Sequence, residues 1–104
     1  MTYDVYLTTT APAGRQRKEA ARIGLEAGTL HVTDLTHTHT ALTALVTSDT
    51  GGTRHGYAVR IGWDGLHCDC KDWQHYGHRH HIACKHLLAA MVVDQMQQDV
   101  PQAA

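Results

Sequence analysis

Three cysteines and one histidine in the second half of the chain have the residue types and the spacing of metal ligands. One residue separates Cys68 from Cys70, thirteen residues follow, and one residue separates Cys84 from His86. Three thiolates and an imidazole make a closed tetrahedral set with no vacant position, which is how proteins hold structural zinc. The pattern therefore predicts one structural zinc ion rather than a catalytic one.

The first ligand pair predicts a β-strand. Residues two apart in a strand point to the same side of the sheet, so Leu66, Cys68 and Cys70 would line one side. His67 and Asp69 would then face the opposite side. Both thiolates of this pair reach a single ion from such a strand.

The second ligand pair predicts the start of a helix. Residues two apart do not face each other within a regular helix, so we expect Cys84 on extended or capping backbone and His86 in the first turn. Apolar residues then recur at helical intervals up to a predicted end near residues 99–101. They are Leu88, Met91, Val92 and Gln95 or Met96.

The first half of the chain predicts strands around one helix. Tyr3, Val5 and Leu7 alternate as a short strand, and a helix is expected over residues 15–27 with Gly28 as its stop. Further elements follow at regular intervals along the chain. They are strands at Leu30 and Val32, at 41–47 and at 57–61, a polar strand edge or loop at 36–40, a turn at 49–53, and a tight reversal at Asp64–Gly65.

These elements predict an α+β fold in one domain over residues 1–104. It would contain a small antiparallel sheet, an N-terminal helix and a β-β-α zinc unit at the C-terminal end. The segments are 1–53 for the strand-helix-strands part, 54–98 for the zinc unit and 99–104 for a tail. A chain of 104 residues suits one small domain.

Residues 57–91 resemble the SWIM zinc-finger family, whose pattern is C-x-C, a variable loop and C-x-H. The chain reads HCDCKDWQ and later IACKHLLAAM, after the strand-like YAVRI. Trp73 lies where the family tends to place an aromatic residue, and Lys85 fills the middle of C-x-H. The resemblance implies a small, stand-alone, bacterial-type β-β-α zinc domain associated with DNA binding and protein contacts. Such domains occur beside helicase-like ATPases, in Mutator-type transposases and in recombination accessory proteins.

Other interpretations of the quartet are weaker. A disulfide framework needs an even number of cysteines and an oxidising compartment, and the chain has three cysteines. Buried free thiols would need no histidine beside them. Four further histidines precede Cys84 and could also supply the imidazole or bind a second metal. They are His75, His78, His80 and His81. His86 is favoured as the fourth ligand, because its position beside Cys84 at a helix start fixes it, whereas ligands in a loop must first be ordered.

Composition limits where the protein acts. No apolar run is long enough to span a membrane, and the N-terminus lacks a secretory pattern. Cysteines kept reduced as metal ligands favour a cytoplasmic location, associated with the nucleoid if the protein binds DNA.

DNA is the partner that the resemblance implies, although the charge is balanced. Nine Lys and Arg stand against ten Asp and Glu, which gives a formal net charge of −1 and no global positive field. The candidate contact residues lie in the zinc unit and on the neighbouring strand. They are Lys71, Trp73, Arg79, Lys85, Arg54 and Arg60. Trp73 has the alternative of packing in the core of the zinc unit.

The predicted N-terminal helix carries a stripe of mixed charge. Arg15, Lys18 and Arg22 share this stripe with Glu19 and Glu26, at intervals that favour opposite-charge pairs. The stripe is therefore expected to be a solvated face rather than a DNA contact.

Two functions remain open, and catalysis is disfavoured. The first is an accessory factor that binds single- or double-stranded DNA in repair, recombination or mobile-element processes. The second is an adaptor that docks onto a separate helicase-like ATPase or another protein, since the chain has no G-x-x-x-x-G-K-[ST] phosphate-binding motif of its own. An enzymatic zinc site needs an open coordination position and a nearby acid or base, and the only glutamates are Glu19 and Glu26. We therefore expect no enzyme activity, no small-molecule substrate and no membrane partner.

Overall fold

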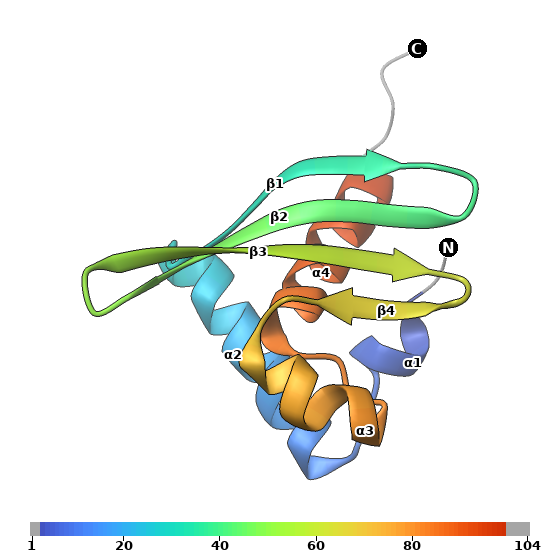
Figure 1. Cartoon of the computed structure of the whole chain (residues 1–104), viewed down its shortest axis with the longest axis horizontal. Coiled ribbons are helices and arrows are strands. Elements are labelled where there is room, and N and C mark those ends of the chain that lie inside the picture. Colours follow the sequence, from blue (N-terminus) through green and yellow to red (C-terminus); the bar gives the residue numbers. More distant parts are fainter. Residues whose placement is uncertain (1–2, 100–104) are drawn as a thin grey trace.

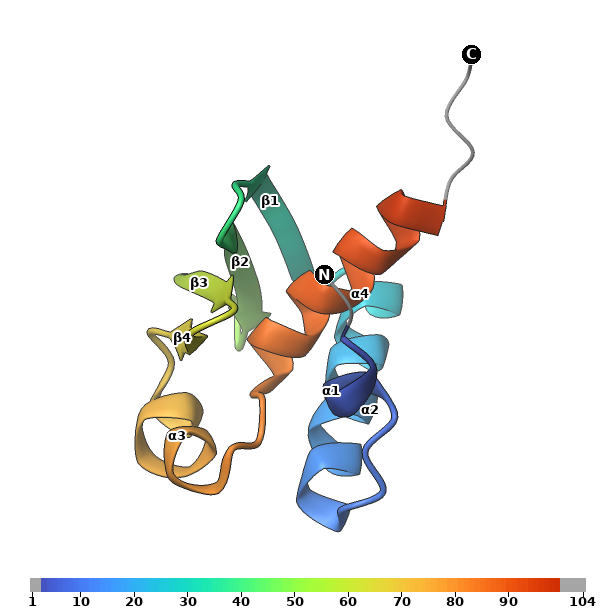
Figure 2. The ribbon, with the colours of Figure 1, turned by 90° about the vertical axis from the view of Figure 1, so that its right-hand side faces the viewer.

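Four strands in sequential order form one antiparallel sheet, and α4, α2 and α1 lie on one side of it (Figures 1 and 2). The structure is a computed structural model that describes residues 3–99. Its strands are β1 (Leu30–His37), β2 (Ala41–Thr50), β3 (Thr53–Gly62) and β4 (Gly65–Cys68). Its helices are α1 (Asp4–Leu7), α2 (Pro12–Ala27), the π-helical turn η1 (Trp73–Gly77), α3 (His78–His80) and α4 (Lys85–Asp99). The predicted α+β class is confirmed.

The core lies between α4 and the inner face of the sheet. Alternate residues of the strands point inward and meet the first half of α4, which contacts all four strands. The largest of these apolar side chains are Leu42, Val46, Val59 and Ile61 from the sheet and Leu87, Leu88 and Met91 from α4. Burying each side chain of this size contributes about 1.5–3 kcal/mol to folding.

α4 is buried on more sides than its sequence pattern indicates. The predicted stripe residues Leu88 and Met91 are buried, but Leu87 is buried as well and Met96 is 63% exposed. The first half of α4 is enclosed between the sheet and α2, so apolar residues are needed around most of its circumference. The predicted end at residues 99–101 lies partly outside the described residues.

The predicted N-terminal helix and its stop are confirmed, although α2 begins at Pro12 rather than at Arg15. Proline suits the first helical turn because a backbone N–H there would have no acceptor within the helix, so its absence costs no hydrogen bond. Gly28 ends the helix in a left-handed conformation with φ of 75°, and its N–H donates to the carbonyls of Gly24 and Leu25. Glycine adopts this backbone conformation without the steric cost of a Cβ atom.

The predicted strand at Tyr3, Val5 and Leu7 is wrong, because Asp4–Leu7 form the short helix α1 directly after Tyr3. The N–H groups of Tyr6 and Leu7 both donate to the carbonyl of Tyr3 at 2.9 Å. Tyr3 is buried because its hydroxyl donates to Asp94 of α4 at 2.5 Å. A contact with a residue so distant in sequence overrides a weak local alternation.

The hairpins follow the predicted strands with small shifts. β2 and β3 pair as far as Thr50 and Thr53, so the predicted five-residue turn contracts to Gly51 and Gly52, both with positive φ. β1 continues to His37, and residues 38–40 form the loop to β2. The reversal at Asp64–Gly65 is present, with Gly62 paired to Gly65.

Candidate metal centre

The four predicted ligands converge in one buried cluster. One ligand atom from each of Cys68, Cys70, Cys84 and His86 lies within 4.8 Å of all the others. Each of these residues is at most 5% exposed. Within the residues that the structure describes, this is the one group of three or more such side chains close enough to hold a metal ion. His86 therefore completes the quartet, as the sequence favoured.

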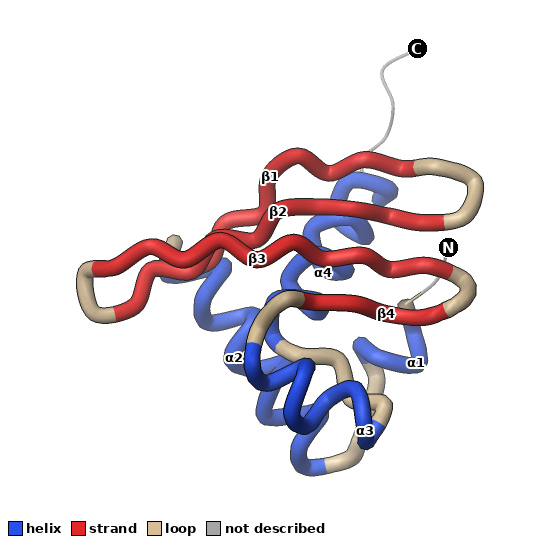
Figure 3. The backbone as a smooth tube through the Cα atoms, viewed as in Figure 1, coloured by secondary structure: helices blue, strands red, loops and turns tan. Residues whose placement is uncertain are grey.

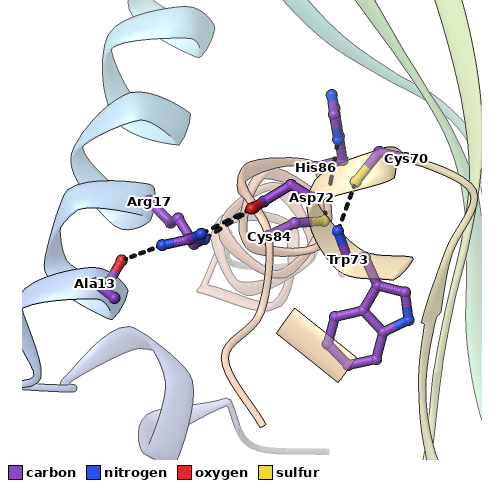
Figure 4. A network of polar contacts seen from close by, with 7 residues as sticks. All are labelled: Ala13, Arg17, Cys70, Asp72, Trp73, Cys84 and His86. Carbon is purple, nitrogen blue, oxygen red and sulfur yellow. Dashed lines mark hydrogen bonds and ion pairs between the residues drawn. The ribbon is translucent and has the colours of Figure 1, made fainter. Parts of the chain in front are cut away.

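The distances within the cluster fit a tetrahedral metal ion. His86 Nδ1 lies 3.9 Å from Cys68 Sγ. It also lies 3.9 Å from Cys84 Sγ, and Figure 4 draws this second contact. Tetrahedral zinc with Zn–S of about 2.3 Å and Zn–N of about 2.0–2.1 Å separates its ligand atoms by about 3.6–3.8 Å. Three sulfurs and one nitrogen around one point are therefore consistent with one structural zinc ion, and this donor set leaves no coordination position for a substrate.

The hairpin of β3 and β4 presents the first two sulfurs as predicted. Cys68, the last residue of β4, pairs with Val59 of β3 and faces the core, and Cys70 is also buried. His67 and Asp69 point outward and bond to each other, with 3.0 Å between Nε2 and Oδ1. The alternation of a strand thus continues through Cys70, although the strand itself ends at Cys68.

The entrance of α4 presents the other two ligands. Cys84 directly precedes the helix, and its carbonyl accepts the N–H of Leu88 at 3.0 Å. His86 lies in the first turn, where the ring of Tyr57 from β3 packs against its imidazole with 4.2 Å between ring centroids. The stacked ring holds the imidazole with Nδ1 toward the sulfurs. Its buried Nε2 has no hydrogen-bond partner among the described residues.

Hydrogen bonds within the cluster favour a thiolate at Cys70. Donation from the thiols of Cys68 and Cys84 lowers the pKa of Cys70, and the backbone N–H of Trp73 also lies 3.4 Å from its sulfur. The same contact with Cys70 raises the pKa of Cys68, which is the donor. A metal must displace the remaining thiol protons, because thiolates are the species that bind zinc.

Residues 71–80, between the two ligand pairs, form a helix rather than a loop (Figure 3). We call this segment the connecting helix. At Gly77 a Cβ atom would lie 2.4 Å from the carbonyl oxygen of Ile82 and 2.7 Å from the ring of Trp73, so only glycine fits. His81 then reverses the chain with a positive φ of 54°, a conformation in which histidine is enriched.

The four histidines of this region do not form a second metal site within the described part of the chain. His75, His78, His80 and His81 are all exposed. The rings of His78 and His80 pack against Trp73 and Tyr76, with centroids 5.9 and 4.3 Å apart.

An ion pair between α2 and the connecting helix was not found from the sequence. Arg17 donates to both carboxylate oxygens of Asp72, at 2.8 and 2.7 Å, and to the carbonyl of Ala13 at 3.1 Å (Figure 4). Its guanidinium carbon also lies 4.5 Å from the centroid of the Tyr76 ring. No local sequence signal connects these residues, because α2 and the zinc unit meet only in the folded chain.

The predicted DNA-contact residues separate into three groups. Lys71 and Arg79 are exposed on the connecting helix, and Lys85 is partly exposed at the start of α4. Arg54 is exposed and Arg60 is partly exposed on β3, and they are paired with Asp49 and Asp64. The third group is Trp73, which is 6% exposed and belongs to the core of the zinc unit. Its ring is packed in the core and is not an exposed surface on which a base could stack, so the prediction that Trp73 stacks on DNA is corrected.

The other tryptophan of the chain was missed by the sequence analysis. Trp63 is 80% exposed in the turn between β3 and β4. A tryptophan in a tight turn bounded by glycines was the available signal, because connecting segments run over the protein surface.

Comparison with known proteins agrees with the geometry. The family model described as SWIM zinc finger matches residues 55–93, which include all four ligands. No curated protein and no solved structure matches the chain. Among the described helices, none has the length and apolar character needed to cross a membrane.

Proposed function

From the SWIM zinc finger at residues 55–93, we propose that this protein is a zinc-stabilised accessory module that binds DNA in repair, recombination or mobile-element processes. The distribution of positive charge carries the proposal. Four of the nine Lys and Arg side chains form ion pairs with carboxylates, namely Arg17, Arg22, Arg54 and Arg60. The other five have no ion pair with a described residue.

The five unpaired cations belong to two helical regions that pack together. Arg15 and Lys18 are in the first half of α2, on the stripe that the sequence predicts to be a solvated face rather than a DNA contact. Lys71 and Arg79 are in the connecting helix, and Lys85 begins α4. The ion pair of Arg17 with Asp72 joins these regions. Asp72 is thereby neutralised, and Arg22 offsets one of the two negative charges of Glu19 and Glu26, with which it pairs. The surface of α2, the connecting helix and the start of α4 therefore carries an excess of positive charge, although the whole chain is nearly neutral.

The zinc ion would support this surface without taking part in chemistry. With zinc bound, the thiolates of Cys68 and Cys70 at the sheet and the ligands Cys84 and His86 at α4 would fix the connecting helix between them. The metal would stabilise the fold by linking the two ligand pairs, because structural zinc sites contribute directly to the free energy of folding. The donor set leaves no open position on the metal, which is the basis for proposing that the protein is not an enzyme.

An adaptor that docks onto a separate helicase-like ATPase, or onto another protein, is the second candidate. It is favoured by an apolar groove of about 280 Å³ between α1 and the segment that leads to Cys84. Val5 and Ile82 line this groove, and Val5 is largely exposed. The net charge of −1 also suits a protein partner better than a strongly bound nucleic acid.

Salt-dependent DNA titration separates the two candidates. Fluorescently labelled single-stranded and duplex DNA would be titrated with zinc-loaded protein at several salt concentrations. Log affinity should fall linearly with log salt. Alanine substitution of Lys71, Arg79 or Lys85 should make this slope less steep. The reduction should be about 0.7–0.9 for each phosphate that the substituted side chain neutralises in the wild type.

Arg22→Ala is the matched control, because Arg22 lies on α2 but is already paired with two glutamates. It should leave the slope unchanged. No binding to either form of DNA at low salt would reject DNA binding and favour the adaptor.

A further inference from the structure

The side chain of Trp63 is largely exposed among the described residues, although its backbone is hydrogen-bonded. Trp63 lies in the two-residue turn between β3 and β4, and its backbone N–H donates to the carbonyl of Thr40 at 3.2 Å. The turn does not require an aromatic residue, because the positive φ that closes it belongs to Gly65. An 80% exposed tryptophan on a rigid hairpin is the kind of surface on which a planar ring stacks.

A hollow of about 290 Å³ lies beside this turn, between β4 and the connecting helix. Its lining combines aromatic rings, imidazoles and one carboxylate. These residues include Tyr6, Asp64, Leu66, Trp73, His78 and His81. Asp64, which follows Trp63 in the turn, is one of the lining residues, so the hollow begins one residue along the chain from the exposed tryptophan. Apolar rings with a few polar groups at the edge suit a flat heteroaromatic ligand.

The polar groups of the hollow match such a ligand better than a metal ion. Asp64, His78 and His81 do not come close enough together to form a metal-binding group within the described residues. The imidazoles of His78 and His81 can instead donate to and accept from the edge of a nucleobase, whereas the carboxylate of Asp64 is already paired with Arg60. Arg79 follows His78 on the exposed surface of the connecting helix and has no ion pair with a described residue. A phosphate next to a bound base would find its positive charge there.

We propose that Trp63 and this hollow form a site for an unpaired nucleobase, so that the DNA bound by this protein is single-stranded. The inference rests on the proposed function and narrows it. A base inside a duplex is stacked on both faces and paired at its edge, so it reaches neither the ring of Trp63 nor the hollow. Stacking contributes affinity without net positive charge, which suits a chain with a net charge of −1.

The two tryptophans make the proposal directly measurable. Because Trp63 is exposed and Trp73 is buried, a Trp73→Phe variant leaves Trp63 as the one fluorophore of this type. Titration with oligo-dT should quench and shift its emission and protect it from iodide. Where Trp73→Phe does not retain zinc, the difference between wild-type and Trp63→Phe emission gives the same signal.

Binding measured by polarisation of labelled oligo-dT tests the contribution of the ring. Trp63→Ala should weaken binding about tenfold or more, whereas Trp63→Phe should retain most of the affinity. Duplex DNA of the same length should bind more weakly than oligo-dT and leave the Trp63 emission unchanged.

The outcomes distinguish this inference from the function on which it rests. The single-strand site would be overturned if oligo-dT bound tightly but left the Trp63 emission unchanged, if Trp63→Ala bound with the affinity of the wild type, or if the duplex bound as tightly as oligo-dT. Each of these results would leave the DNA-binding function standing. No binding to any DNA would overturn both, and Trp63 would then be a candidate anchor for a protein partner.

Discussion

Arg17 and Asp72 form a bidentate ion pair although Asp72 follows Arg17 by 55 positions along the chain. The guanidinium of Arg17 is held on one side by the carbonyl of Ala13 and lies over the ring of Tyr76. Asp72 lies two residues after the ligand Cys70. The pair therefore couples α2 to the zinc unit, and the N-terminal half of the chain becomes part of the structure around the metal centre.

Removing either partner of this pair should destabilise the fold. A bidentate and partly buried pair is stronger than an ordinary surface pair, so a double-mutant cycle of Arg17→Ala and Asp72→Ala should give a coupling energy of about 1 kcal/mol. Urea unfolding of the four zinc-loaded proteins measures it. Arg22→Ala should change stability by less than about 0.5 kcal/mol, because its partners lie on the same exposed helix. A coupling energy near zero would show that α2 is held by its apolar contacts alone.

Removing the metal should loosen the zinc unit before the rest of the fold. Chelation leaves three buried thiols and a buried imidazole without their common partner, and structural zinc supplies on the order of 10 kcal/mol in small zinc domains. Elemental analysis should find one zinc ion per chain, and Cys70→Ser should lose it. Hydrogen exchange after chelation should increase first in the connecting helix and β4. A chain that keeps its exchange pattern without metal would contradict a structural role for the ion.

The ligand set was predictable because its geometry is local. Residues two apart share a face in a strand but not in a helix, so the spacing of Cys68 with Cys70 and of Cys84 with His86 indicated both elements. What the sequence did not predict depends on contacts between distant segments. α1 is fixed by the bond from Tyr3 to Asp94, and nothing near Tyr3 in the sequence signals that partner.

Burial of aromatic residues was equally hard to predict from spacing. Trp73 follows a ligand and was a candidate for DNA contact, yet the close approach of Gly77 to its ring places it in the core. Trp63 lies at a turn, where only the arrangement of the hairpins shows that its side chain is largely exposed among the described residues.

Gly77→Ala should disrupt the connecting helix. The new Cβ would overlap the carbonyl oxygen of Ile82 and the ring of Trp73, and neither the backbone nor a buried ring yields at low cost. We expect a loss of about 1–3 kcal/mol in the free energy of unfolding and weaker zinc binding, because Cys84 follows this segment.

Gly56→Ala is the matched control for that substitution. At Gly56 the new Cβ would lie 3.5 Å from the nearest atom, Cδ1 of Leu45, which is an ordinary contact. Its effect on stability should be small and its zinc affinity should equal that of the wild type. Equal zinc affinities and equal stabilities for the two variants would contradict the packing around Gly77.

Tyr3→Phe should remove a loss of stability at high pH. Burial, and then the hydrogen bond to Asp94, raise the pKa of Tyr3 above its ordinary value. Above about pH 10 a tyrosine ionises in the unfolded chain, while folded Tyr3 keeps its proton. The contribution of Tyr3 to the free energy of unfolding is thus fully present below pH 10. It declines as the pH rises, by about 1 kcal/mol at pH 11.

The variant separates this effect from other groups that titrate in the same range. Urea unfolding between pH 8 and 11, with zinc present, would compare wild type and Tyr3→Phe. Near pH 8 the variant should be less stable by about 1 kcal/mol, because Asp94 loses a donor and keeps those of His37 and Gln98. The difference should shrink as the pH rises, since phenylalanine does not ionise in either state. A difference that stays constant up to pH 11 would show that the hydroxyl of Tyr3 ionises equally in the folded and unfolded chains.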